Sequence, residues 1–130
     1  MADFLIKENK MLNEKCYSFK HKSGLDVYVI PKKMTTSYAI LATQYGAIDN
    51  KFKLNKDNDF TVVPDGIAHF LEHKLFECEG GIDAFELFAK TGANANAFTS
   101  FDKTCYIFTA TDKVDESLDI LLNFQNYQTL

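Results

Sequence analysis

The stretch that decides the fold of this chain spans residues 65–77 and has the sequence DGIAHFLEHKLFE. In a helix, residues three and four positions apart are neighbours, so His69, Glu72, His73 and Phe76 would share one face. The other side would carry an apolar stripe made of Ile67, Ala68, Leu71 and Leu75. We therefore expect a buried helix that is covered by protein on both faces.

His69 and His73 have the spacing at which two imidazoles on one helix can reach one Zn²⁺ at about 2.0–2.1 Å. Glu72 lies between them in projection, where a carboxylate could take a proton from a metal-bound water whose pKa the metal lowers toward ~7. This order, His-x-x-Glu-His, is the inverted motif of zinc peptidases. The alternative is a pair of solvent-facing histidines beside a glutamate. Because two of the chain's 3 histidines fall in this pattern, the metal site is favoured.

A second motif supports the interpretation as a zinc-peptidase site. Residues 95–100 have the sequence ANAFTS, and together with GIAHFLEH at 66–73 they resemble the catalytic half-domain of the insulinase/pitrilysin family of zinc endopeptidases. The resemblance covers most of the chain and implies that His69 and His73 bind one catalytic zinc ion, with Glu72 as the general base. The family takes its third zinc ligand from a glutamate on a later helix, which the resemblance places beyond residue 130.

The resemblance also indicates where a substrate lies. In the family, the strand that carries the second motif is the edge strand beside the zinc, to which an extended peptide adds itself. This implies that Asn96, Ala97 and Phe98 contact a peptide or unfolded-protein substrate. Without the resemblance the segment is an ordinary edge strand. The family encloses its substrate between two such halves, so a second half-domain, in cis or in trans, is the implied partner.

The composition is that of a folded domain: 46% of the 130 residues are hydrophobic, 25% are charged, and the net charge is −4. The lysines are scattered, so nothing favours nucleic acid as a partner. The N-terminus has no basic start followed by a long apolar run, and no stretch reaches membrane-spanning length, so no membrane association is expected. The 3 cysteines lack paired metal spacing and fit a reducing compartment, which predicts a cytoplasmic location.

Alternating residues predict a β-hairpin over residues 16–30, with His21 near its turn as a surface histidine. Residues 38–45 are apolar on both faces and predict a central strand that is covered on both sides. Residues 49–59 are polar and predict a solvated loop.

The motif helix is expected to follow Asp65 as its N-cap and to end by residues 80–81. Cys78 is expected to pack as a small hydrophobe and not to bind the metal. A second helix should begin after Asp83, with Glu86 completing a capping box, and end at Gly92.

Two strands are predicted over residues 93–99 and 103–110. A third helix, capped by Thr111 or Asp112, should bury a stripe made of Val114, Leu118, Leu121, Leu122 and Gln125. The acidic side chains on its outer side are interpreted as solvated first-turn acids and not as a substitute zinc ligand; they are Asp115, Glu116 and Asp119.

These elements predict an α+β fold with helices packed on one face of a largely antiparallel sheet, truncated relative to the family's half-domain. We expect residues 1–130 to form a single partial domain, with residues 1–13 as an N-terminal extension. A truncated core would expose an apolar patch, through which the chain could self-associate.

The function these observations predict is that of a zinc-dependent endopeptidase, and the 130-residue chain is expected to be an incomplete and inactive fragment. The alternative is a non-catalytic peptide-binding or scaffold module that keeps the fold and the motif but lacks the third ligand. A structural zinc domain is disfavoured, because such sites are closed by four protein ligands.

Overall fold

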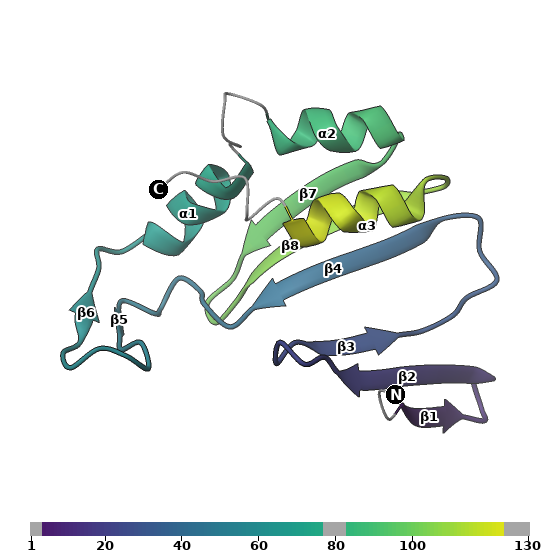
Figure 1. Ribbon diagram of the computed structural model, residues 1–130, viewed down its shortest axis with the longest axis horizontal. Coiled ribbons are helices and arrows are strands. Elements are labelled where there is room, and N and C mark those ends of the chain that lie inside the picture. Colours follow the sequence, from purple (N-terminus) through teal and green to yellow (C-terminus); the bar gives the residue numbers. More distant parts are fainter. Residues whose placement is uncertain (1–3, 77–82, 124–130) are drawn as a thin grey trace. The chain divides into compact units, whose positions relative to one another are not determined.

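The computed structural model describes residues 4–76 and 83–123. The chain divides into two compact units, residues 1–35 and residues 36–130 (Figure 1). The expected end of the motif helix at residues 80–81, Cys78 and Gln125 lie outside the described residues.

The first unit is a three-stranded antiparallel sheet in the order β1-β2-β3. Its strands are β1 (Leu5–Asn9), β2 (Glu14–Lys20) and β3 (Asp26–Val29). The predicted hairpin is confirmed by β2 and β3, which are joined by a turn in which Gly24 adopts a φ of +94°. His21 is exposed in this turn, with Nδ1 2.8 Å from Oγ of Ser23, as expected of a surface histidine. Strand β1 lies within the stretch expected to be an N-terminal extension.

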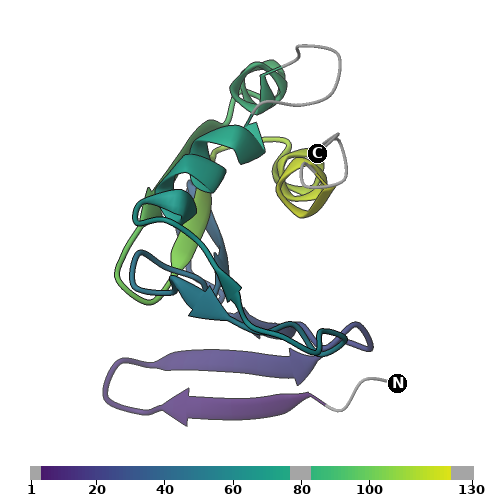
Figure 2. The ribbon, with the colours of Figure 1, turned by 90° about the vertical axis from the view of Figure 1, so that its left-hand side faces the viewer.

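The second unit contains a three-stranded antiparallel sheet in the order β4-β8-β7, a small β5-β6 ribbon and three helices (Figures 1 and 2). The strands are β4 (Ser37–Thr43), β5 (Lys51–Phe52), β6 (Thr61–Val62), β7 (Asn94–Thr99) and β8 (Thr104–Ala110). The helices are α1 (Ile67–Phe76), α2 (Ala84–Thr91) and α3 (Val114–Asn123). The two strands predicted in the second half of the chain are therefore confirmed.

All three helices pack on one face of this sheet, as predicted. Successive residues of a strand point to opposite faces, so Tyr106, Phe108 and Ala110 of β8 share a face. These residues form one core with residues from each helix: Phe76 of α1, Ala84 and Phe88 of α2, and Leu121 of α3. Helices α2 and α3 lie side by side over it (Figure 2). In the described parts of the chain, no helix combines the length and the apolar character needed to span a bilayer.

The helix α2 forms where its local signals predicted it. The side chain of Asp83 accepts a hydrogen bond of 2.8 Å from the backbone N–H of Phe85, which caps the first turn. Gly92 ends the helix in the left-handed conformation, with a φ of +76° that favours glycine. Both ends of the helix are therefore fixed by residues adjacent to it in sequence.

The strand predicted to be central lies at an edge of the described sheet. Strand β8 occupies the middle of the β4-β8-β7 order and pairs on both sides, whereas Tyr38 and Ile40 of β4 are 61% and 49% exposed. An apolar run indicates a strand but not its neighbours, because pairing is set by distant segments. The polar loop prediction over residues 49–59 was also incomplete, since Lys51–Phe52 pairs with Thr61–Val62.

The buried stripe of α3 differs from the prediction. Ser117 and Leu121 are buried, while Leu118 and Leu122 are 39% and 44% exposed. Ser117 can occupy the core because its hydroxyl donates to the backbone carbonyl of Lys113 at 3.0 Å and lies 2.8 Å from the Thr91 hydroxyl. The predicted stripe is therefore right for Leu121 and for the partly buried Val114, and wrong for Leu118 and Leu122.

Candidate active site

Helix α1 places its polar residues over strand β7. Gly66 occupies the N-cap position, one residue later than predicted: its carbonyl accepts the first helical hydrogen bond, from Phe70 N at 3.0 Å, and its φ is +85°. The Asp65 carboxylate accepts a hydrogen bond from the Asn50 side chain. The start of the helix is thus tied to the β5-β6 region.

Helix α1 is covered on one side only, so the prediction of a helix buried on both faces was wrong. Ala68, Glu72 and Phe76 are buried, whereas Phe70 is 56% exposed and both histidines are exposed. The exposed imidazoles are reachable by a ligand from outside the chain.

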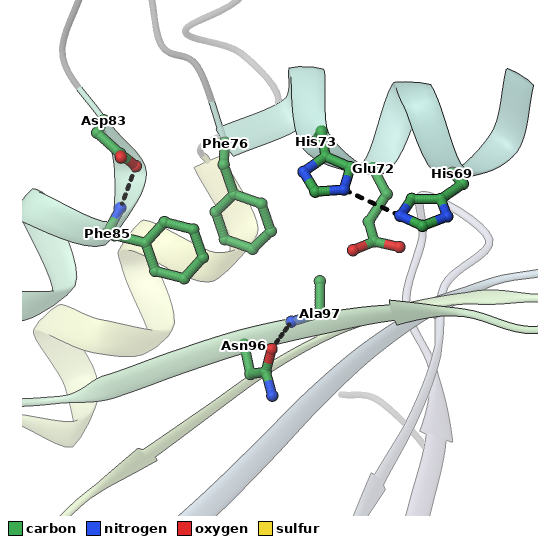
Figure 3. A pocket seen from close by; sticks show the side chains of 8 residues that line it. All are labelled: His69, Glu72, His73, Phe76, Asp83, Phe85, Asn96 and Ala97. Atoms are coloured by element: carbon green, nitrogen blue, oxygen red, sulfur yellow. Dashed lines mark hydrogen bonds between the residues drawn. The ribbon is translucent and has the colours of Figure 1, made fainter.

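The two histidines approach each other through the same ring atom. The Nε2 atoms of His69 and His73 are 2.9 Å apart, and their rings are stacked with centroids 4.8 Å apart (Figure 3). Two nitrogens that each lie about 2.0–2.1 Å from one Zn²⁺ can be separated by no more than about 4.2 Å. The separation, which is that of a hydrogen bond between the two rings, lies within this limit for two ligands of one zinc ion.

Glu72 lies between the histidines in sequence but projects toward the sheet, where it is only 8% exposed (Figure 3). Its Oε2 atom accepts a hydrogen bond from the hydroxyl of Thr99 on β7. Burial, and secondly the negative charge of Glu72, raise the pKa of the Tyr106 phenol well above its usual value. The carboxylate is therefore largely buried and is held by a hydroxyl donor.

A pocket of about 450 Å³ opens between α1, the start of α2 and β7 (Figure 3). Its lining residues are His69, Glu72, His73, Phe76, Asp83, Phe85, Asn96 and Ala97. The rings of Phe76 and Phe85 stack with centroids 4.2 Å apart and give the pocket an apolar wall beside its polar end. Such a mixture of apolar surface and a few convergent polar groups is typical of a ligand site.

The structure brings most of the predicted site residues into this pocket. His69, Glu72, His73, Asn96 and Ala97 line it, while Phe98 is 44% exposed and is not among the lining residues. Side chains alternate along the strand, so Ala97 faces the helices while the Asn96 and Phe98 side chains point to the other face. Of these two residues, only Asn96 borders the pocket.

Phe85, Asp83 and Thr99 were not predicted from the sequence as site residues. The first two were interpreted only as parts of α2, and Thr99 only as part of a strand. The position of Thr99 within the ANAFTS motif was a sequence signal that could have identified it as a site residue. Among the residues the structure describes, no group of three His, Cys, Asp or Glu side chains could hold a metal ion.

The chain is similar in sequence to a family of known peptidases. Residues 62–130 match the family model described as insulinase (peptidase family M16). The chain is 52% identical over 118 residues to an uncharacterized zinc protease of Bacillus subtilis, YmfH, covering 90% of this chain and 27% of the relative. It is 30% identical over 125 residues to the zinc protease PqqE of Helicobacter pylori, covering 89% of this chain and 26% of that protein.

The fold agrees with these relatives. An M16-like peptidase of Alicyclobacillus acidocaldarius superposes with a TM-score of 0.78 at 38% identity, over 85% of this chain and 26% of that one. The chain is thus related to zinc proteases, and it belongs to the insulinase family, peptidase family M16. It spans about a quarter of the length of the relatives it matches.

Proposed function

We propose that this chain carries the catalytic helix of a zinc-dependent endopeptidase that hydrolyses oligopeptides or unfolded polypeptides. The observation that carries the proposal is the pair of Nε2 atoms of His69 and His73, 2.9 Å apart, on the same helix and in the same pocket as the buried Glu72. Membership of the insulinase family supports it.

In this proposal, His69 and His73 are two ligands of one zinc ion, which when bound supplies a Lewis acid for the scissile carbonyl. Glu72 takes a proton from the attacking water and later gives it to the departing amine. Because Oε2 is engaged by Thr99, Oε1 is the oxygen assigned to proton transfer.

The substrate is proposed to lie extended along β7, an edge strand of the described sheet, with Asn96, Ala97 and Phe98 in contact with it. Backbone groups of the strand would pair with the peptide. The stacked Phe76 and Phe85 would hold an apolar substrate side chain, since they form the apolar wall of the pocket.

The third zinc ligand is proposed to lie beyond residue 130, and a second half-domain, in cis or in trans, to enclose the substrate. The described residues supply a histidine pair and no third ligand beside it. The 130-residue chain alone is therefore expected to be an inactive fragment. The cytoplasmic location remains a prediction that rests on the cysteines. Self-association through exposed apolar residues also remains a prediction, which sedimentation velocity can test.

The test compares Glu72→Gln with Glu86→Gln, a matched change on the exposed first turn of α2. Both are placed in a protein extended through the third ligand and its partner half. Glu72→Gln should lose roughly 10²–10⁴-fold in turnover of a quenched-fluorescent peptide, because an amide cannot accept the proton, with zinc content unchanged. Glu86→Gln should retain turnover.

The 130-residue chain with added zinc serves as a further arm and should give no turnover. Chelator-sensitive cleavage by this short chain, lost on Glu72→Gln, would show that it completes its site in another way. Near-normal cleavage by the extended Glu72→Gln protein would overturn the assigned mechanism.

A second candidate function is a non-catalytic peptide-binding or scaffold module that keeps the fold but not a complete metal site. The finding that favours it is that the described residues hold only the histidine pair. An extended protein that bound both zinc and a peptide but did not cleave the peptide would support this alternative.

A further inference from the structure

We infer that Thr99 is a positioning residue, whose hydroxyl holds the Glu72 carboxylate in the orientation needed for proton transfer. The contact itself is independent of function, whereas its catalytic consequence rests on the proposed function. Thr99 lies at the end of β7 and Glu72 in the middle of α1, so the hydrogen bond joins the motif helix to the strand proposed to bind substrate.

The direction of this hydrogen bond follows from the neighbouring hydroxyl. Thr104, paired with Thr99 across β7 and β8, donates its single hydroxyl proton to the Tyr45 carbonyl at 2.8 Å. The Thr99 and Thr104 hydroxyl oxygens are 3.4 Å apart, a long contact. An ionised carboxylate only accepts hydrogen bonds, so the Thr99 proton is directed to Glu72.

The backbone that follows Thr99 is held by hydrogen bonds to two other segments, residues 47–48 and Lys103. After β4, the N–H groups of Ala47 and Ile48 donate to the carbonyls of Ser100 and Phe101 at 2.9 and 3.0 Å. Ser100 N–H donates to the Lys103 carbonyl at 2.8 Å, which closes the turn between β7 and β8. The strand pairing of Thr99 with Thr104 and these hydrogen bonds hold the hydroxyl in place, and a donor held in place restricts the carboxylate to one orientation.

Burial makes the contact costly to lose. A carboxylate that is only 8% exposed has limited access to water that could replace a missing donor. Without the Thr99 hydroxyl, Glu72 would turn toward another donor or toward water. Either movement displaces the base, and small displacements of a catalytic group lower turnover steeply.

The first experiment measures coupling without activity, in the metal-free 130-residue chain. Thr99→Val keeps the shape and strand preference of the side chain and removes only the hydroxyl. It should lower Tm by several degrees when Glu72 is present and by clearly less in a Glu72→Ala background, because the hydroxyl has then lost its acceptor. Thr99→Ser should restore Tm. Equal Tm shifts in the two backgrounds would contradict a hydrogen bond between Thr99 and Glu72.

The matched control is Thr109→Val on β8. Thr109 is a half-buried strand threonine on the sheet face opposite Thr104 and Tyr106, because strand side chains alternate. Its Tm change should be the same with and without Glu72.

The second experiment uses the extended, zinc-loaded protease. Thr99→Val should lower kcat about 10-fold, part of the roughly 10²–10⁴-fold that a general base supplies, with KM and zinc content unchanged. Thr99→Ser should recover most of kcat. An unchanged kcat for Thr99→Val beside an inactive Glu72→Gln would overturn this inference alone. Full activity of Glu72→Gln would overturn the proposed function, while the coupling in the metal-free chain would still stand.

Discussion

Tyr106 shows how one residue links the core to the candidate site. It is 3% exposed, packs with its ring centroid 5.8 Å from that of Phe76, and its pKa is raised first by burial and then by the charge of Glu72. The fold therefore favours the neutral phenol. The same low-dielectric surroundings that shape the Glu72 site also set the behaviour of this tyrosine at alkaline pH.

We predict that Tyr106 makes the unfolding free energy fall as pH rises above about 10. In the unfolded chain the phenol ionises at its ordinary pKa of 10.0, whereas the folded chain retains the proton until a higher pH. Below pH 10 both states are protonated, so Tyr106 contributes no pH dependence there. Measured by urea unfolding between pH 8 and 11, the unfolding free energy should fall less at alkaline pH for Tyr106→Phe than for the unaltered chain.

The control for this measurement is Tyr28→Phe, because Tyr28 is 69% exposed in the first unit. Its pH profile should match that of the unaltered chain. If the unfolding free energy of Tyr106→Phe fell above pH 10 as much as that of the unaltered chain, the pH dependence could not be assigned to Tyr106.

The arrangement of the two histidines and the glutamate could be predicted at the residue scale, because its signal is local. His69, Glu72 and His73 occupy one turn of a helix, and sequence spacing alone predicts that they are neighbours. The contact between Glu72 and Thr99 joins residues 27 positions apart in different elements. No periodicity within either element encodes that approach, which depends on how α1 lies over β7.

At the scale of elements, the same distinction between local and distant signals holds. Helix α2 was predicted with both ends, since Asp83 and Gly92 supply its caps from neighbouring sequence. The position of β4 at an edge of the described sheet was not, because its apolar run does not specify its partners. In α3, the buried Ser117 was missed, because a hydroxyl becomes compatible with a core only when its hydrogen-bond partners are known.

The connection after β4 carries a prediction at this scale. A Cβ atom on Gly46 would collide with the backbone of Phe101 and Lys103, in the turn that follows Thr99. Gly46→Ala should therefore destabilise the chain by ~1–3 kcal/mol or more in urea unfolding and, in the extended protease, lower turnover, because backbone cannot move aside cheaply.

Gly92→Ala is the comparison variant. At Gly92 a Cβ would meet nothing within 4 Å, so the cost is only that of a left-handed φ, about 1–2 kcal/mol. We expect stability to fall while the turnover of the folded fraction is kept. Loss of turnover in Gly92→Ala and not in Gly46→Ala would show that the turn after Thr99 does not position the site.

At the scale of the whole molecule, the chain is two units, and the candidate site belongs entirely to the second. Residues 36–130 contain α1, β7 and the pocket, whereas residues 1–35 form their own three-stranded sheet. The chain covers about a quarter of the length of its zinc-protease relatives. The zinc affinity of the 130-residue chain therefore measures how much of the proposed zinc site these residues provide.

We predict that the 130-residue chain binds Zn²⁺ weakly. Two imidazoles with Nε2 atoms 2.9 Å apart can hold one ion, but a catalytic zinc site uses three protein ligands, and the described residues add no third side chain to the pair. Complete four-ligand sites gain ~10–16 kcal/mol, so isothermal titration should give a Kd weaker than about 10⁻⁷ M.

Substitution of the histidines identifies the site that this titration measures. His69→Ala combined with His73→Ala should abolish the binding, because it removes both nitrogens. His21→Ala removes an exposed imidazole from the first unit and should leave the binding unchanged. Tight one-to-one binding that survived the double substitution would place the metal elsewhere in the chain. It would also remove the basis for assigning Glu72 as the base, because Glu72 acts beside a metal held by these two histidines.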